Sequence, residues 1–141
     1  MPAARPCVVF VCVKNAGKSQ MAAALARRDA GELLEIHSAG VRPGSDLNDL
    51  SRRSLDEVGA SVAGEHPKPL DPALLRRADR VVVLGREAVV EPIDGMRGTI
   101  TTWETDEPSE RGIDGIERMR LVRDDIGRRV DALIAELVPR S

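Results

Sequence analysis

The chain has 141 residues, with 21 Lys or Arg against 23 Asp or Glu, and its formal net charge is -2 at neutral pH. This length supports one hydrophobic core, so we expect a single domain over residues 1–141. The slightly acidic balance argues against nucleic acid as the main partner. No apolar stretch is long enough to cross a membrane, residues 1–11 lack a signal-peptide pattern, and two cysteines make no disulfide framework. These features favour a cytoplasmic protein without membrane attachment.

Candidate strands and helices alternate along most of the chain. Short apolar runs predict strands, and apolar residues at intervals of three or four predict helices. In chain order we predict a strand at 7–12, a helix at 20–30, a strand at 33–37, a helix at 47–58, a weaker strand at 61–63, a helix at 72–78 capped by Asp71, a strand at 80–84 and a weaker strand at 99–102.

The C-terminal segment carries the clearest helical pattern. Its apolar residues recur every three or four positions and predict one long helix with a buried stripe and a solvated charged face. Alternation of strands and helices predicts an α/β fold with a doubly wound parallel sheet, whose active site lies at the carboxyl ends of the strands. The stripe consists of Ile113, Ile116, Met119, Val122, Ile126, Val130, Leu133 and Leu137.

Cys12 begins the segment with the most chemical information. It follows the apolar run 8–11 and opens Cys12-Val-Lys-Asn-Ala-Gly-Lys18-Ser19, so we expect its thiol in a loop between a strand and a helix. A helix N-terminus offers unpaired N–H groups and a partial positive charge, which stabilise a thiolate and a bound oxyanion. Cys12 is therefore a candidate nucleophile.

Two other interpretations of this loop stay open. Cysteine is often a small buried hydrophobic residue, which would make Cys12 structural. The ending Gly17-Lys18-Ser19 also matches the nucleotide-binding pattern G-x-x-x-x-G-K-[ST], but Cys12 stands at the first glycine of that pattern. In addition, the run 81–84 is followed by Gly85 and an arginine rather than by a magnesium-binding aspartate.

The loop resembles the signature of the low-molecular-weight phosphotyrosine phosphatase superfamily, in which Cys, five residues, Arg and Ser follow one another. Lys18 stands at the arginine position. Two further segments, 19–22 (Ser-Gln-Met-Ala) and 103–108 (Trp-Glu-Thr-Asp-Glu-Pro), are similar to segments of its arsenate reductase branch. Residues 37–40 (His-Ser-Ala-Gly) are similar to the Ser-Ala-Gly that follows the second strand in the superfamily. The resemblance implies a three-layer, doubly wound, four-stranded parallel sheet and an enzyme acting on arsenate or phosphate.

This resemblance also implies functions for individual residues. Cys12 would be the nucleophile, and the Ser19 hydroxyl would hydrogen-bond its thiolate. The general acid would be Glu107, directly before a proline, with Asp106 left open as the alternative; both could also be loop carboxylates without a catalytic function. Asn15 would hold the loop shape. The amide groups expected to surround the oxyanion belong to Val13, Lys14, Asn15, Ala16, Gly17, Lys18 and Ser19.

Lys18 is the main departure from the superfamily signature. Arginine pairs with two oxygens of phosphate or arsenate through a planar fork, whereas lysine is a point charge on a flexible stem. We expect this change to weaken phosphoryl transfer more than reaction with arsenate, because phosphoryl transfer depends on positioned equatorial oxygens. Lys14 would add a second cation, unless it is only a solvent-exposed side chain.

The small number of cysteines points to an external reductant. Some relatives carry an internal disulfide relay on two more cysteines after the fourth strand, but residues 83–90 contain none here. Cys7 is expected in the core, on the opposite strand face from Cys12. The chain is therefore most similar to the mycothiol-dependent arsenate reductases, or arsenate-mycothiol transferases. In these, mycothiol removes the arsenic and a mycoredoxin or glutaredoxin-like protein completes reduction to arsenite. Only three of the 21 basic residues are lysines, a bias consistent with a G+C-rich genome and thus a weak hint toward mycothiol.

We expect no bound cofactor and no metal. A potassium site of some relatives uses a carboxylate where this chain has Ala23, and no metal-ligand spacing joins His37 and His66. Two alternative functions remain: a low-molecular-weight tyrosine phosphatase hydrolysing phosphotyrosine or aryl phosphate, and a non-catalytic oxyanion-binding or redox-sensing module. The chain has no tyrosine and one phenylalanine, Phe10, which we predict to be buried, so aromatic walls for a phosphotyrosine ring are scarce.

Overall fold

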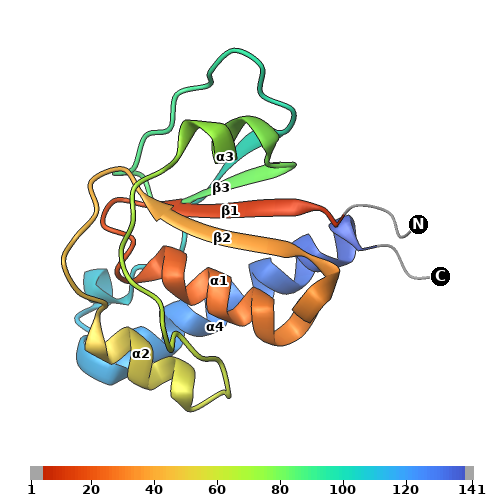
Figure 1. Cartoon of the computed structure of the whole chain (residues 1–141). Helices are drawn as coiled ribbons and strands as arrows, with labels where there is room; N and C mark the ends of the chain where they lie inside the picture. The colour runs from red at the N-terminus through yellow and green to blue at the C-terminus, as the bar shows by residue number, and fades with distance from the viewer. Residues whose placement is uncertain (1–4, 139–141) are drawn as a thin grey trace.

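A computed structural model describes residues 5–138 and shows a parallel sheet with helices on both faces (Figure 1). The sheet has the strand order β2-β1-β3-β4, and every pair of neighbouring strands is parallel. The strands are β1 Cys7–Cys12, β2 Glu35–Gly40, β3 Arg80–Leu84 and β4 Thr99–Trp103. The helices are α1 Lys18–Ala30, α2 Asp49–Asp56, α3 Pro72–Arg77 and α4 Gly115–Leu137, with short 3-10 turns η1 Gly31–Leu33 and η2 Pro108–Arg111.

Alternation along β1 divides the core into two parts. Val8 and Phe10 pack on the face covered by α1 and α4, whereas Val9 and Val11 pack on the face covered by α3. Figure 1 shows α3 on one side of the sheet and α1, α2 and α4 on the other. This arrangement confirms the expected three-layer α/β fold with a four-stranded parallel sheet.

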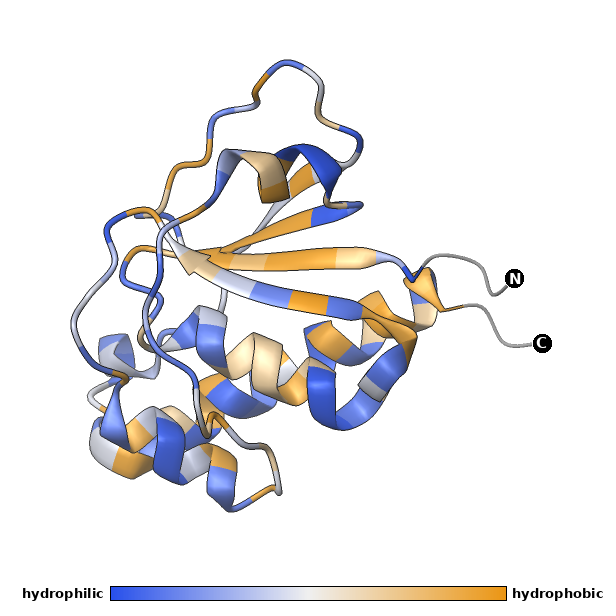
Figure 2. Ribbon diagram, in the orientation of Figure 1, coloured by the Kyte–Doolittle hydropathy of each residue, from blue (hydrophilic) through white to orange (hydrophobic). Residues whose placement is uncertain are grey.

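The two long helices follow the predicted patterns. Residues 21–26 of α1 are all buried, since the helix lies between the sheet and its neighbours α2 and α4. In α4 the predicted stripe is confirmed at its centre, where Val122, Ile126 and Val130 are buried. The helix begins at Gly115, so Ile113 of the predicted stripe precedes it. Figure 2 shows β1 as mostly hydrophobic, whereas hydrophobic and hydrophilic residues alternate along the helices.

Three sequence predictions need correction. Residues 61–63 form no strand; Val62 is buried from a loop, so its apolar character reflects packing rather than strand pairing. The second strand begins at Glu35 rather than at residue 33, because Leu33 lies in η1 with an exposed side chain. The second helix is shorter than 47–58: Asn48 accepts a hydrogen bond from the Ser51 amide (2.9 Å) and thereby caps α2.

The capping prediction for the third helix is confirmed. Asp71 Oδ1 accepts a hydrogen bond from the Ala73 amide (3.0 Å), and Pro72 occupies the first helical position, where its missing N–H costs nothing. Among the helices that the structure describes, none has both the length and the apolarity needed to cross a bilayer. The parallel strands bring the loops after β1, β3 and β4 to one edge of the sheet, as expected for this topology.

Candidate active site

The loop of residues 13–17 connects β1 to α1, and three of its carbonyl groups accept hydrogen bonds from a neighbouring segment. Hydrogen bonds from the segment that follows β2 hold these carbonyls, which fixes the orientation of the peptide planes. Among the described residues, the amide groups of residues 14–17 donate no hydrogen bond, so they are available to an anion held over the loop. The three bonds run from Arg42 N to Val13 O (2.8 Å), from Gly44 N to Lys14 O (3.0 Å) and from Asn48 N to Ala16 O (2.8 Å).

Gly40 explains part of the motif at residues 37–40. A Cβ atom at this position would lie 2.8 Å from Val13 O and 2.9 Å from Asn15 N, both atoms of the loop backbone. Such contacts are too short for any side chain, so glycine lets the end of β2 pass directly beneath the loop. The sequence motif thus reflects close packing of two backbones.

Asn15, Ser19 and Cys12 form a directed chain of hydrogen bonds. Asn15 adopts a left-handed backbone conformation (φ 53°), which asparagine tolerates better than most residues. Its Nδ2 group donates to Ser19 Oγ (2.8 Å), and Ser19 Oγ lies 2.9 Å from Cys12 Sγ. Because Ser19 accepts from Asn15, its own hydroxyl proton is free to point toward the sulfur. This arrangement lets Ser19 donate a hydrogen bond to the Cys12 sulfur.

Lys68 holds the side-chain oxygen of Asn15, the amide atom that does not contact Ser19. Its backbone amide donates to Asn15 Oδ1 (3.1 Å), and its ammonium lies 3.5 Å from the same oxygen and donates to Ser38 Oγ (3.1 Å). Gln20 Nε2 donates to the same Asn15 oxygen at 3.2 Å. Burial lowers the pKa of Lys68, and the neighbouring Glu65 charge partly offsets that effect. Neither Lys68 nor Gln20 was predicted from sequence to support the loop.

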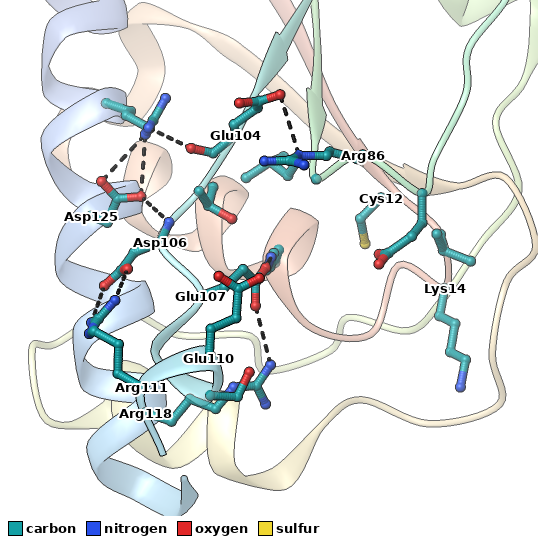
Figure 3. Close-up of a pocket in the computed structure, with 18 of the residues that line it drawn as sticks. Cys12, Lys14, Arg86, Glu104, Asp106, Glu107, Glu110, Arg111, Arg118 and Asp125 are labelled. Atoms are coloured by element: carbon teal, nitrogen blue, oxygen red, sulfur yellow. Dashed lines mark hydrogen bonds and ion pairs between the residues drawn. The ribbon is translucent and has the colours of Figure 1, made fainter. Parts of the chain in front are cut away.

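Lys18, at the arginine position of the signature, pairs across the pocket with the expected general acid. Its Nζ contacts Glu107 Oε1, and the other carboxylate oxygen of Glu107 lies 3.7 Å from Arg118 Nη2. Figure 3 shows Glu107 and Arg118 on the side of the pocket opposite Cys12. Arg118 comes from the charged face of α4, and nothing in its sequence context distinguished it from the other arginines of that helix.

Asp106 is held away from this cluster. Its carboxylate accepts two hydrogen bonds from Arg111 (2.8 and 3.1 Å), and these bonds hold its pKa below the usual range for aspartate. The backbone of the same loop is fixed to α4, since Asp125 accepts from the Asp106 amide (2.9 Å) and Arg129 donates to Glu104 O (2.7 Å). Of the two candidate acids, only Glu107 contacts Lys18.

Cys12, Lys18 and Glu107 line one pocket of about 950 Å³ at the carboxyl edge of the sheet (Figure 3). Lys14 lies at its rim with an exposed side chain that extends away from Cys12. The lining residues are mostly polar or charged and include none with an aromatic ring. They are Cys12, Val13, Lys14, Lys18, Leu84, Gly85, Arg86, Glu87, Glu104, Thr105, Asp106, Glu107, Ser109, Glu110, Arg111, Arg118, Asp125, Arg128 and Arg129.

Both aromatic rings of the chain pack elsewhere. Phe10 is fully buried, as predicted, and its ring centroid lies 6.0 Å from that of Trp103, with the ring planes tilted by 54°. The two rings therefore stabilise the core beneath β3 and β4. A substrate in the pocket meets no aromatic wall.

Cys7 is separated from Cys12 by the sheet itself. Both cysteines are free and buried, but Cys7 packs on the α3 face of β1, as predicted from strand alternation. Burial, followed by the negative charge of Glu35, raises the pKa of Cys7 to about 11, so its thiol stays protonated near neutral pH. Cys7 is not placed to exchange disulfides with Cys12.

Comparison with known proteins agrees with this geometry. Residues 7–140 match the family described as Low molecular weight phosphotyrosine protein phosphatase. An arsenate reductase of Halalkalibacterium halodurans is 29% identical over 127 residues, covering 87% of this chain and 91% of that protein.

Two solved structures extend the comparison. A thioredoxin-dependent arsenate reductase of Corynebacterium glutamicum superposes with a TM-score of 0.79 at 31% identity, covering 97% of this chain but only 64% of that one. A structure of an arsenate reductase in the phosphate binding state has a TM-score of 0.80 at 25% identity, covering 94% of this chain and 98% of that one. By its family match, its parallel sheet and its cysteine loop, this chain belongs to the low molecular weight phosphotyrosine protein phosphatase family.

Proposed function

We propose that the protein is an arsenate reductase that works with an external thiol, as an arsenate-mycothiol transferase. The observation that carries this proposal is the isolation of Cys12. The chain has only one other cysteine, and that residue lies on the opposite face of β1 with its thiol buried. An arsenic adduct on Cys12 therefore needs a thiol from outside the chain.

The first step would take place within the loop. Arsenate would bind over the amides of residues 14–17 with Lys18 against one oxygen. The Cys12 sulfur would attack arsenic, so that an S–As bond forms as one As–OH bond breaks. Glu107 would supply the proton that turns the leaving hydroxide into water. The hydroxyl of Ser19, oriented by Asn15, would stabilise the thiolate before attack and after its release.

The second step would regenerate the enzyme. The sulfur of an external thiol would attack arsenic, the bond between arsenic and Cys12 would break, and a thiol–arsenate conjugate would leave. A mycoredoxin or glutaredoxin-like protein would then attack the sulfur of that conjugate. This step forms a mixed disulfide and releases arsenite, so two thiol sulfurs are oxidised as As(V) becomes As(III). Such chemistry requires a reducing compartment, which favours the cytoplasm.

The pocket supports a co-substrate larger than arsenate. Its volume of about 950 Å³ far exceeds that of a tetrahedral oxyanion, and its polar lining suits a hydroxyl-rich thiol such as mycothiol. A small dithiol protein could also reach Cys12 through it, which matters because one structural relative is described as thioredoxin-dependent. Hydrolysis of phosphotyrosine is the less favoured alternative, since no aromatic residue lines the pocket.

Arsenate-dependent NADPH oxidation tests the proposal. Purified protein would be assayed with mycothiol, a mycoredoxin and its disulfide reductase, and in parallel with thioredoxin and thioredoxin reductase. The Cys12→Ser variant serves as the blank. Turnover confined to the mycothiol system is the expected result. Turnover only with thioredoxin would show that the external thiol is a protein dithiol rather than mycothiol. No turnover with either system would overturn the proposal that the protein is an arsenate reductase.

A further inference from the structure

A second cluster of reactive side chains lies on the α3 face of the sheet, at the opposite end of β1 from Cys12. Cys7 pairs in register with Glu35 across β1 and β2, and His37 follows two residues later, on the same face as Glu35. One ligand atom from each of these three residues lies within 4.8 Å of the others. Cys7 and Cys12 are the two ends of β1, about 16 Å apart at 3.3 Å per residue, so this cluster is separate from the pocket.

The donor set is that of a zinc-type ion. Thiolate sulfur, imidazole nitrogen and carboxylate oxygen are the three side-chain ligands that Zn²⁺ uses, and three protein ligands plus one water complete a tetrahedron. Ligand atoms around a tetrahedral zinc are about 3.5 Å apart, so no pair within the 4.8 Å limit has to close by more than about 1.3 Å. Side-chain rotation of Glu35 and His37, which are 27% and 33% exposed, can supply this movement.

A positively charged side chain, that of Arg77, already contacts the cluster. The Arg77 guanidinium on α3 donates to Glu35 Oε2 and lies 3.8 Å from Cys7 Sγ, while His37 Nε2 lies 2.6 Å from the same Glu35 oxygen. Asp79 adds a further negative charge and accepts a hydrogen bond from the Cys7 amide (2.7 Å). The cluster thus favours positive charge, and Arg77, which is 52% exposed, can move into solvent.

We propose that Cys7, Glu35 and His37 bind a divalent zinc-type ion, which displaces Arg77. The S–H bond of Cys7 breaks as the sulfur–metal bond forms, and the proton passes to the buffer. The three ligands come from the neighbouring strands β1 and β2. The bound ion would therefore link these two strands at the end of the sheet that is remote from the pocket. No ligand spacing predicts this site, because Cys7 lies 28 and 30 residues from Glu35 and His37.

Cobalt absorption tests the site directly, because a thiolate ligand gives Co²⁺ a near-ultraviolet charge-transfer band. The titration would use the full-length Cys12→Ser variant, in which Cys7 is the one remaining thiol. We expect the band to saturate at one equivalent of Co²⁺ and to disappear when Zn²⁺ is added. The Cys7→Ser change should remove it.

Matched pairs of variants keep the result clear if Cys7→Ser fails to fold. Arg77→Gln should lower the Kd for Co²⁺ by about tenfold, whereas Arg76→Gln, with the same loss of charge on the same helix, should leave it within about twofold. His37→Gln should raise the Kd by about tenfold or more, and the exposed His66→Gln should not. The proposal is overturned if no thiolate band forms in the Cys12→Ser protein even with Arg77→Gln, or if His37→Gln leaves the Kd unchanged.

Discussion

Lys18 and Glu107, which are 89 residues apart in the chain, form an ion pair across the pocket. In the free protein the cation at the arginine position of the signature is therefore held by the residue expected to act as the general acid. An oxyanion entering the loop has to compete with Glu107 for the Lys18 ammonium. Binding of the substrate would thus also free Glu107 from Lys18.

This competition predicts opposite effects of Glu107→Gln on binding and on turnover. Removing the carboxylate should lower the Kd for phosphate, a non-reducible analogue, by about twofold to fivefold, the range for a half-exposed ion pair. Arsenate turnover should fall by about a hundredfold or more, because no group replaces the proton donor. Phosphate binding would be measured by calorimetry and turnover by NADPH oxidation.

Glu110→Gln is the matched control, since Glu110 lines the same pocket and carries the same charge. If both variants bind phosphate more tightly by the same factor, the cause is the loss of a negative charge from the pocket rather than the loss of the contact with Lys18. Asp106→Asn provides the second comparison. Because Arg111 holds the pKa of Asp106 low, this carboxyl is a poor proton donor, and we expect its loss to reduce turnover far less than the loss of Glu107.

Lys18→Arg should shift the chain toward phosphatase activity. A guanidinium restores the planar fork that pairs with two equatorial oxygens, and one added charge-assisted hydrogen bond corresponds to about tenfold in rate. We expect kcat/KM for p-nitrophenyl phosphate to rise by about that factor relative to kcat/KM for arsenate. Equal changes for both substrates would show that the identity of the cation does not discriminate between them.

Lys68→Met should weaken anion binding although Lys68 does not line the pocket. The ammonium steadies Asn15 Oδ1 and Ser38 Oγ, and Asn15 in turn orients Ser19. Because the Lys68 amide and Gln20 still hold Asn15, we expect only about threefold to tenfold weaker phosphate binding.

Ser38→Ala, which removes the hydroxyl that accepts from the ammonium at 3.1 Å, tests whether this effect runs through the network. It should cost less than Lys68→Met on its own and add little to it in the double variant. Full additivity of the two changes would argue against a shared path to Asn15. A thermal unfolding scan of each variant would separate loss of the network from loss of the fold.

Glu57, at the end of α2, pairs with arginines of α4, and we expect this contact to weaken at acidic pH. Hydrogen bonds from Arg120, the larger cause, and from Arg123 lower the pKa of Glu57 to about 2. A lowered pKa in the folded state stabilises the protein above the unfolded-state value, about 4.3 for glutamate, and that contribution is lost as the pH falls toward 2. Glu57→Gln should therefore lower the melting temperature at pH 6 and have a much smaller effect near pH 2, where the folded-state carboxyl is already partly protonated.

Glu117→Gln controls for charge in the acid experiment. Glu117 is 75% exposed and lies 3.6 Å from the same Arg120, so its loss should change the melting temperature little at either pH. A constant difference between the wild-type and Glu57→Gln proteins from pH 6 to pH 2 would contradict the assignment of the low pKa.

Local patterns in the sequence were sufficient for the outline of the fold. The apolar run at β1, the loop after it, the cap at Asp71 and the stripe of α4 each depend on residues close together in the chain, so their structure follows from spacing and backbone chemistry. The same holds for the hydrogen bonds that join Cys12, Asn15 and Ser19 to one another, which span at most seven residues. Local pattern failed at Val62, which is buried from a loop without strand pairing, and at Leu33, whose apolar side chain is exposed in a 3-10 turn.

The tertiary structure alone decided the contacts that give the site its chemistry. The pairing of Lys18 with Glu107, the support of Asn15 by Lys68, and the meeting of Cys7 with Glu35 and His37 all join distant segments. Strand order and register bring these segments together, and many arginines and acids on the same surface compete for each charged partner. A sequence shows which charges are available, whereas only the folded chain determines which of them meet.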